Sequence, residues 1–192
     1  MTTTADRTNE LLEATCRVVA RAGAHALTMS QVAREAGVSN ALLHYYFRTR
    51  GELLSLAFAH AEERVYELAR TQLAALPTGT AKLARFLELY FEDNVVFDTD
   101  EALWNEVWSS ALFDPELRPT LAEAYARWVA TIVDLVAAGR TDGSLPKGVE
   151  PERTGRRLAA LVDGLGTQTT LGLLDRKEAA ALLRDALAAE TA

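Results

Sequence analysis

Residues 28–47 read TMSQVAREAGVSNALLHYYF, and this stretch decides the fold of the chain. Thr28 and Gln31 have the spacing of a capping box, which starts a helix. Gly37 can adopt the left-handed backbone that ends a helix, and Ser39 can cap a second one. The stretch therefore predicts two short helices joined by a tight turn, a helix-turn-helix. Helical hairpins also occur in proteins that do not bind DNA, so this pattern by itself leaves DNA binding open.

A more specific signal runs from Ala33 to Leu54. The Gly37-Val38-Ser39 turn, the cluster Tyr45-Tyr46-Phe47 and Arg50 fall in the register of the DNA-binding signature of the TetR family of bacterial regulators. The resemblance covers about the first 65 residues and implies a DNA-binding domain of three helices at residues 5–65. The family usually has a small residue, a Tyr and a Lys where this chain has Leu42, His44 and Arg50. These departures leave the base preference open.

The composition is that of an all-helical globular protein. Hydrophobic residues make up 49% of the 192 residues and charged residues 24%, while prolines number only 5. No segment approaches the roughly 18 uncharged apolar residues of a membrane span, and the polar N-terminus lacks the apolar core of a signal peptide. We therefore expect a cytoplasmic protein with no membrane partner, whose one cysteine, Cys16, is buried.

Charge is divided unevenly along the chain. The net charge is −7, but residues 1–50 carry six arginines and four acidic residues, a balance of +2, which leaves −9 for the remainder. A mildly basic head on an acidic body suits a protein that presents one end to phosphate. The asymmetry supports DNA binding without establishing it.

Apolar periodicity and caps predict an all-α fold of about nine helices. Besides the pair within 28–47, we expect helices at residues 6–22, 49–76, 80–97, 101–112, 115–138, 152–173 and 175–189. The helix at 49–76 is long enough to form a rigid strut between the DNA-binding domain and a larger body. We expect this body, residues 66–192, to bind a ligand and to dimerise.

The body carries a second and less specific resemblance, over residues 104–168. The runs DPELR at 114–118 and LVDGL at 161–165 are similar to the C-terminal domain of BetI-like members of the TetR family. The regulator that gives this type its name responds to choline. Because the domain type occurs widely, the resemblance does not imply choline for this chain.

The second helix of the helix-turn-helix is the expected base reader. Asn40 can pair bidentately with adenine, Ala41 or Leu42 can touch a thymine methyl group, and Tyr45 is also exposed. Candidates for phosphate contacts, which fix register rather than sequence, are Ser30, Ser39, His44, Tyr46, Arg48 and Arg50. For His44 the resemblance supports this role, because the family uses a Tyr there to contact the DNA backbone. One of the two tyrosines can instead pack on the first helix.

Binding to two half-sites requires a homodimer. The resemblance implies a dimer surface on the last two helices, where small residues permit close approach. Its residues are Leu158, Leu161, Val162, Leu165, Thr169 and Gly172 on one helix and Leu182, Leu183 and Leu187 on the other. The alternative is that these residues form the core of a monomer.

Aromatic and acidic residues of the body indicate a small-molecule pocket. Trp104 and Trp108 lie four residues apart on one helix face, and carboxylates beside aromatic rings can hold a cation. The candidate pocket residues are Tyr90, Asp93, Asn94, Trp104, Trp108, Tyr125 and Trp128. An aromatic stripe at helical spacing is more often core, so pocket and core stay open as alternatives.

Together these features predict a ligand-responsive transcriptional repressor that binds a palindromic DNA operator and is released by a small-molecule effector. The chain lacks a Gly-rich phosphate loop, metal-ligand spacing and a nucleophile elbow, so we expect no enzyme activity, metal or cofactor. A helical protein-binding adaptor and a small helical enzyme are the alternatives. The sequence does not specify the operator, the target genes or the effector. It also does not decide between repression and activation.

Overall fold

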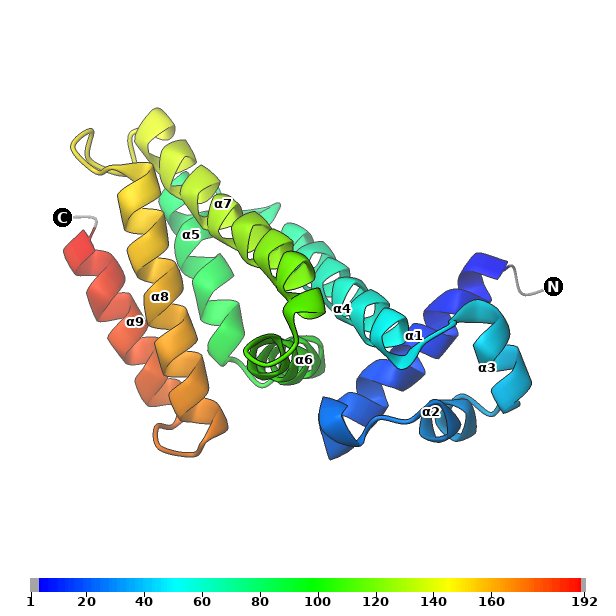
Figure 1. Cartoon of the computed structure of the whole chain (residues 1–192). Coiled ribbons are helices and arrows are strands. Elements are labelled where there is room, and N and C mark those ends of the chain that lie inside the picture. The colour runs from blue at the N-terminus through cyan, green and yellow to red at the C-terminus, as the bar shows by residue number, and fades with distance from the viewer. Residues whose placement is uncertain (1–3, 191–192) are drawn as a thin grey trace. The chain divides into compact units, whose positions relative to one another are not determined.

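Residues Thr4–Glu190 are described by the computed structural model, and all secondary structure in this range is helical, which confirms the expected fold class (Figure 1). The described chain forms nine α-helices and three short 3-10 helices. None of these helices is long and apolar enough to cross a membrane.

The helices group into two compact units. The first unit runs to Tyr66 and also takes in Val95–Ala124, whereas the second comprises Glu67–Asn94 and the chain from Tyr125 onward. The first unit contains α1 (Thr4–Ala22), η1 (Ala24–Ala26), α2 (Met29–Glu35), α3 (Asn40–Tyr46), α6 (Val95–Ala111) and η3 (Pro115–Leu117). The second unit contains α5 (Gly79–Glu88), η2 (Leu89–Phe91), α8 (Pro151–Thr170) and α9 (Arg176–Glu190). Two long helices, α4 (Arg50–Leu73) and α7 (Arg118–Asp142), contribute residues to both units.

Amphipathic helices from distant parts of the sequence share one core in the first unit. Helix α1 buries one apolar face. The buried Thr15 hydroxyl on this face donates a hydrogen bond to the Leu11 carbonyl at 2.8 Å. Leu103 and Val107 of α6 join this core, as does Ala124. Residues 95–124, which the sequence grouped with the body, therefore pack with the head helices because their apolar side chains are buried there.

Small residues let helices approach closely in the second unit. A Cβ on Gly79 would lie 2.1 Å from the backbone N of Gly139, so the start of α5 fits against the end of α7 only without a side chain. Asp142 accepts the Gly79 N–H at 2.6 Å and holds the same junction. A Cβ on Gly155 of α8 would likewise lie 2.6 Å from Val133 of α7. Helices α8 and α9 pack side by side (Figure 1).

The ends of α5 and α8 and the start of α6 differ from the expected boundaries. Helix α5 ends at Glu88 and passes into a single 3-10 turn, and α6 begins at Val95 rather than at residue 101. The polar run at 92–94 turns the chain, and Arg85 binds Glu92 in this turn. Helix α8 ends at Thr170 rather than at residue 173 because Gly172, expected inside the helix, adopts a φ of +67°.

Candidate nucleic-acid interface and ligand site

The helix-turn-helix forms through the caps that its sequence predicts. The Thr28 hydroxyl accepts the Gln31 N–H at 3.2 Å, and the Thr28 N–H donates to the Gln31 side chain at 2.9 Å, so the capping box is complete. Gly37 ends α2 with a φ of +66°, which lets the Val38 N–H reach the Ala33 carbonyl at 2.9 Å. The turn thereby sets the direction in which α3 leaves α2.

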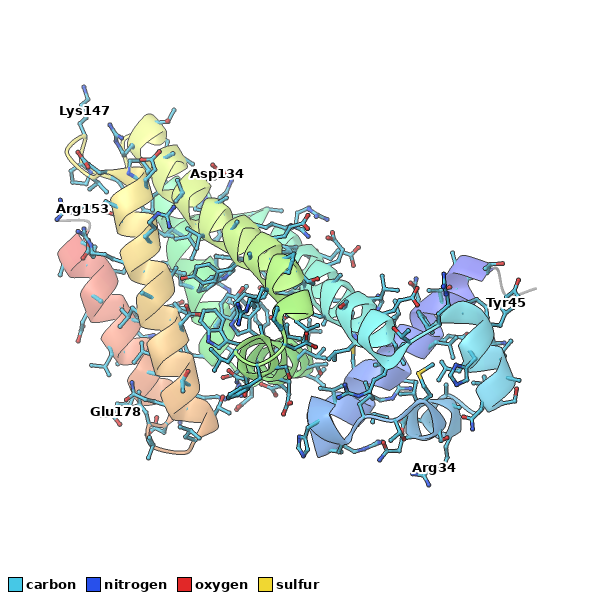
Figure 2. All side chains as sticks on the ribbon, viewed as in Figure 1. Arg34, Tyr45, Asp134, Lys147, Arg153 and Glu178 are labelled. Atoms are coloured by element: carbon cyan, nitrogen blue, oxygen red, sulfur yellow. The ribbon has the colours of Figure 1, made fainter. Side chains whose placement is uncertain are left out.

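Helix α3 has a buried and an exposed side. Its N-terminus is capped by Ser39, whose hydroxyl accepts the Leu42 N–H at 3.1 Å. Leu43 and Phe47 are buried and anchor the helix in the core. The expected base-reading face is exposed, and Tyr45, with 79% of its surface accessible, extends from it (Figure 2). The exposed residues of this face are Asn40, Ala41, Leu42, His44 and Tyr45.

A hydrogen bond joins the two helices of the motif on its exposed surface. The Asn40 Nδ2 donates to the Ser30 Oγ at 3.1 Å. Ser30 is the second residue of α2, and Asn40 is the first residue of α3. The structure thus brings a candidate phosphate contact and a candidate base reader together, which the sequence did not predict.

Two of the candidate phosphate contacts, Tyr46 and Arg50, also have structural contacts. Tyr46 is half-buried against the core, and its ring meets the ring of Tyr45 edge-on, with centroids 5.3 Å apart. The Arg50 Nε donates to the Leu27 carbonyl at 2.9 Å and ties the start of α4 to the segment before α2. Arg48 is exposed.

Some arginines of the DNA-binding domain form ion pairs with acidic residues of the same domain. Arg17 and Arg21 of α1 bind Glu35 of α2 at 3.0 and 2.6 Å. Hydrogen bonds from Arg21 and then from Arg17 lower the pKa of Glu35 to about 2. These two arginines therefore hold α1 on α2. Arg34, which was not among the expected contacts, is exposed on α2 and points away from it (Figure 2).

Three of the expected ligand residues come together in the second unit. The rings of Tyr90 and Tyr125 each lie 5.9 Å from the ring of Trp128. Asp163 of α8 joins them, since the Tyr125 hydroxyl donates to its carboxylate. Burial raises the pKa of Asp163 to about 6 and also raises the pKa of Tyr125. Asp163 was not among the expected ligand residues, and its one signal in the sequence is an acidic residue inside an apolar run.

The other expected ligand residues are Trp104 and Trp108 of the first unit and Asp93 and Asn94 of the second. Trp104 belongs to the first unit, where its ring lies 5.5 Å from that of Phe58 and 5.9 Å from that of Trp108. Trp104 packs against the core, whereas Trp108 is 42% exposed. Asp93 and Asn94 lie in the turn before α6, with Asp93 exposed. The expected ligand residues thus belong to two separate units.

A buried carboxylate in the first unit had not been predicted. Asp100 of α6 is only 8% exposed, and its Oδ1 has no hydrogen-bond partner among the described residues. Burial, together with repulsion from Glu62 and Glu101, raises the pKa of Asp100 to about 8. Asp100 is therefore mainly protonated at neutral pH. It lies in an acidic stretch of sequence, which usually indicates a solvated surface.

The residues expected at the dimer surface divide by burial. Those buried within the second unit are Leu158, Val162, Leu165, Leu183 and Leu187. Leu161 and Thr169 are half-buried, whereas Gly172 and Leu182 are exposed. Two exposed apolar residues between α8 and α9 were missed, Leu171 and Leu173. Four of the expected residues therefore stay accessible, Leu161, Thr169, Gly172 and Leu182, and Leu171 and Leu173 add to them.

Two family models match the chain. Residues 11–57 match the bacterial regulatory proteins of the tetR family, and residues 77–192 match the C-terminal domain of the BetI-type transcriptional repressor. The HTH-type transcriptional regulator BetI of Escherichia coli (strain K12) is 30% identical over 182 residues, which cover 93% of this chain and 90% of that protein.

Solved structures agree with this match. A TetR-family transcriptional regulator from Rhodococcus sp. has a TM-score of 0.89 at 26% identity and covers 98% of this chain and 100% of its own. A transcriptional regulator from Saccharomonospora viridis, solved in complex with choline, has a TM-score of 0.84 at 26% identity and covers 95% of each chain. The chain therefore belongs to the TetR family of ligand-responsive, DNA-binding transcriptional regulators, which are not enzymes, and its C-terminal part is of the BetI type.

Proposed function

We propose that this regulator is a repressor that binds a palindromic operator as a homodimer and leaves it when a small-molecule effector binds. The observation that carries this proposal is the exposed face of α3, whose opposite side is anchored in the core by Leu43 and Phe47. One such helix covers one half-site, so two copies are needed to read a palindrome. We assign DNA binding to residues 5–65 and ligand binding and dimerisation to residues 66–192, and we place the protein in the cytoplasm with the chromosome.

We assign base reading to the first part of α3 and phosphate binding to the residues around it. Asn40 pairs with adenine, and Ala41 and Leu42 contact thymine methyl groups, with Tyr45 beside them. Phosphate contacts fall to Ser30, Ser39, His44, Tyr46, Arg48 and Arg50, to which we add the exposed Arg34. Such contacts make the affinity for DNA fall as salt rises.

For the dimer we propose the outward side of α8 and α9. The leucines of these helices that are already buried support the surface from behind, and the exposed apolar side chains meet the partner. The proposed contact residues are Leu161, Thr169, Leu171, Gly172, Leu173 and Leu182.

A charged residue at Leu182, which is 45% exposed, should dissociate this dimer, because a carboxylate would be buried against an apolar partner surface. We expect Leu182→Glu to sediment as a monomer at a concentration where the wild type is a dimer. Leu112→Glu is the control, since Leu112 is exposed in the first unit and should leave the dimer intact. A Leu182→Glu protein that stays dimeric would place the dimer surface elsewhere.

As effector class we propose an organic cation bound by Tyr90, Tyr125, Trp128 and Asp163. Three aromatic rings offer their quadrupoles, and the Asp163 carboxylate offers a charge, within one compact unit. The choline complex of the similar Saccharomonospora viridis regulator supports this class. Asp93 and Asn94 of the same unit remain further candidate contacts.

Selection of bound duplexes from a random DNA pool tests the function as a whole. Purified protein at moderate salt should enrich a palindrome with two half-sites, and choline should be the first cation tested for releasing it. Enrichment of a single unpaired site would contradict the dimeric reader. No enrichment at any salt concentration, with and without choline, would overturn DNA reading by this chain.

A further inference from the structure

Ser30 and Asn40 are joined on the exposed surface of the helix-turn-helix. The Asn40 Nδ2 donates to the Ser30 Oγ at 3.1 Å, although ten residues separate the two in sequence. Both side chains are exposed, so the bond is not a by-product of core packing. A residue proposed to bind phosphate is therefore in direct contact with the residue proposed to read a base.

The turn between the helices fixes which hydroxyl meets the Asn40 amide. Gly37, with a φ of +66°, redirects the chain after α2. The hydroxyl of the neighbouring Ser39 is occupied as the cap of α3, because it accepts the Leu42 N–H at 3.1 Å. Ser30 thus supplies the contact that orients the first side chain of α3.

We propose that Ser30 is a positioning residue for base recognition, which holds the Asn40 amide in the orientation that reads adenine. This inference rests on the proposed function, in which α3 enters the major groove of an operator. In that setting Ser30 contacts a phosphate and Asn40 at the same time. The phosphate contact and the base preference then become one coupled interaction.

The hydrogen-bonding groups of the two side chains are sufficient for this arrangement. An asparagine amide has two N–H groups and one carbonyl oxygen. With one N–H donated to Ser30, the other N–H and Oδ1 remain for the bidentate contact to N7 and N6 of adenine. The Ser30 hydroxyl accepts from Asn40 and still has its own O–H to donate to a phosphate.

The phosphate contact is what makes the orientation unique. A serine hydroxyl can donate or accept, so Ser30 alone would also tolerate a rotated Asn40 with its carbonyl toward the hydroxyl. Once the Ser30 hydroxyl donates its O–H to a phosphate, its oxygen can only accept a hydrogen bond. Asn40 must then present an N–H to Ser30 and not its carbonyl oxygen. A rotated amide would point an N–H at the exocyclic group of the base, which suits O6 of guanine rather than the amino group of adenine. Ser30 thereby favours adenine over guanine.

The test measures base discrimination on the palindrome obtained by duplex selection. The position read by Asn40 is the one at which Asn40→Ala no longer distinguishes A·T from G·C. At this position Ser30→Ala should lower the discrimination about twofold to tenfold, the contribution of one hydrogen bond. Ser30→Thr keeps a hydroxyl group and should therefore retain the discrimination of the wild type. In the Asn40→Ala background, Ser30→Ala should cause no further loss of discrimination.

Arg34→Ala is the matched control, because Arg34 is also exposed on α2, four residues after Ser30 (Figure 2). Arg34→Ala should weaken binding equally to the two operators compared, which carry A·T or G·C at the position read by Asn40. Thermal melting should show that each variant stays folded. If Ser30→Ala also weakens both operators equally, or if its loss of discrimination persists in the Asn40→Ala background, the positioning role is overturned. If the wild type enriches no duplex, the proposed function itself fails, and this inference with it.

Discussion

At the scale of single residues, Asp100 and Asp163 are carboxylates whose surroundings raise their pKa values. Burial is the main cause for both, but Asp163 accepts a hydrogen bond from Tyr125, whereas Asp100 faces repulsion from two further acids. Neither environment could be predicted from the sequence, because the burial of an acid depends on which distant helices cover it. The caps at Thr28 and Ser39, by contrast, involve residues within three positions and could be predicted.

Asp100→Asn should stabilise the protein by an amount that grows with pH. The pKa of Asp100 is about 8 in the folded protein against an ordinary value of 3.8, so its contribution to stability is fully present below pH 3.8 and is lost as pH rises through 8. Asparagine does not ionise, so the variant avoids this loss. Thermal unfolding between pH 4 and pH 9 should show the margin over wild type widening up to about pH 8. A margin that stays constant with pH would contradict the assignment.

The affinity for choline should fall in acid through Asp163. Above a pKa of about 6 its carboxylate is charged and attracts a cation, and below that value protonation removes the attraction. Titration of tryptophan fluorescence with choline between pH 5 and pH 8 measures this change. Asp163→Asn should bind weakly and without the pH dependence, whereas Asp134→Asn, a change on the exposed side of α7, should behave as wild type (Figure 2). A wild-type affinity independent of pH would exclude Asp163 from the site.

At the scale of elements, local signals decide where helices start, and packing decides more often where they end. The capping box of α2 is formed as predicted. Helix α9 starts where it was expected, at a cap in which the Asp175 carboxylate accepts the Glu178 N–H at 2.8 Å. The end of α5 was missed, because apolar residues continue at helical spacing through Leu89 and Phe91 while the chain already turns. The end of α8 was missed because Gly172 was interpreted as an interface residue rather than as the helix stop.

Gly37→Ala should destabilise the first unit by about 1 kcal/mol, because a side chain disfavours the left-handed backbone that ends α2. A Cβ at this position meets nothing within 4 Å, so the cost is conformational rather than steric. Gly148→Ala is the matched control, since that glycine is equally open and lacks a left-handed φ. Chemical denaturation of the two variants should show a loss only for Gly37→Ala. Equal stabilities would mean that the turn is not held by Gly37.

At the scale of the whole molecule, two helices link the two units. Both α4 and α7 contribute residues to each unit, whereas the sequence indicated only the helix at 49–76 as a strut. The grouping of α6 with the head rests on Leu103 and Val107, whose partners lie far away in sequence. A conformational change in the second unit can therefore reach the first unit through either of these two helices. By linkage, an effector that weakens DNA binding must itself be bound more weakly, by the same factor, when DNA is present.

The most direct measurement is a binding titration of labelled duplexes that carry either the whole selected palindrome or the palindrome with one half-site scrambled. We expect two chains per duplex on the whole palindrome, with affinity at least about tenfold higher than on the scrambled duplex. Asn40→Ala should reduce this difference while remaining a dimer in sedimentation. Equal binding of both duplexes by the wild type, or an unchanged preference in Asn40→Ala, would contradict sequence reading by α3.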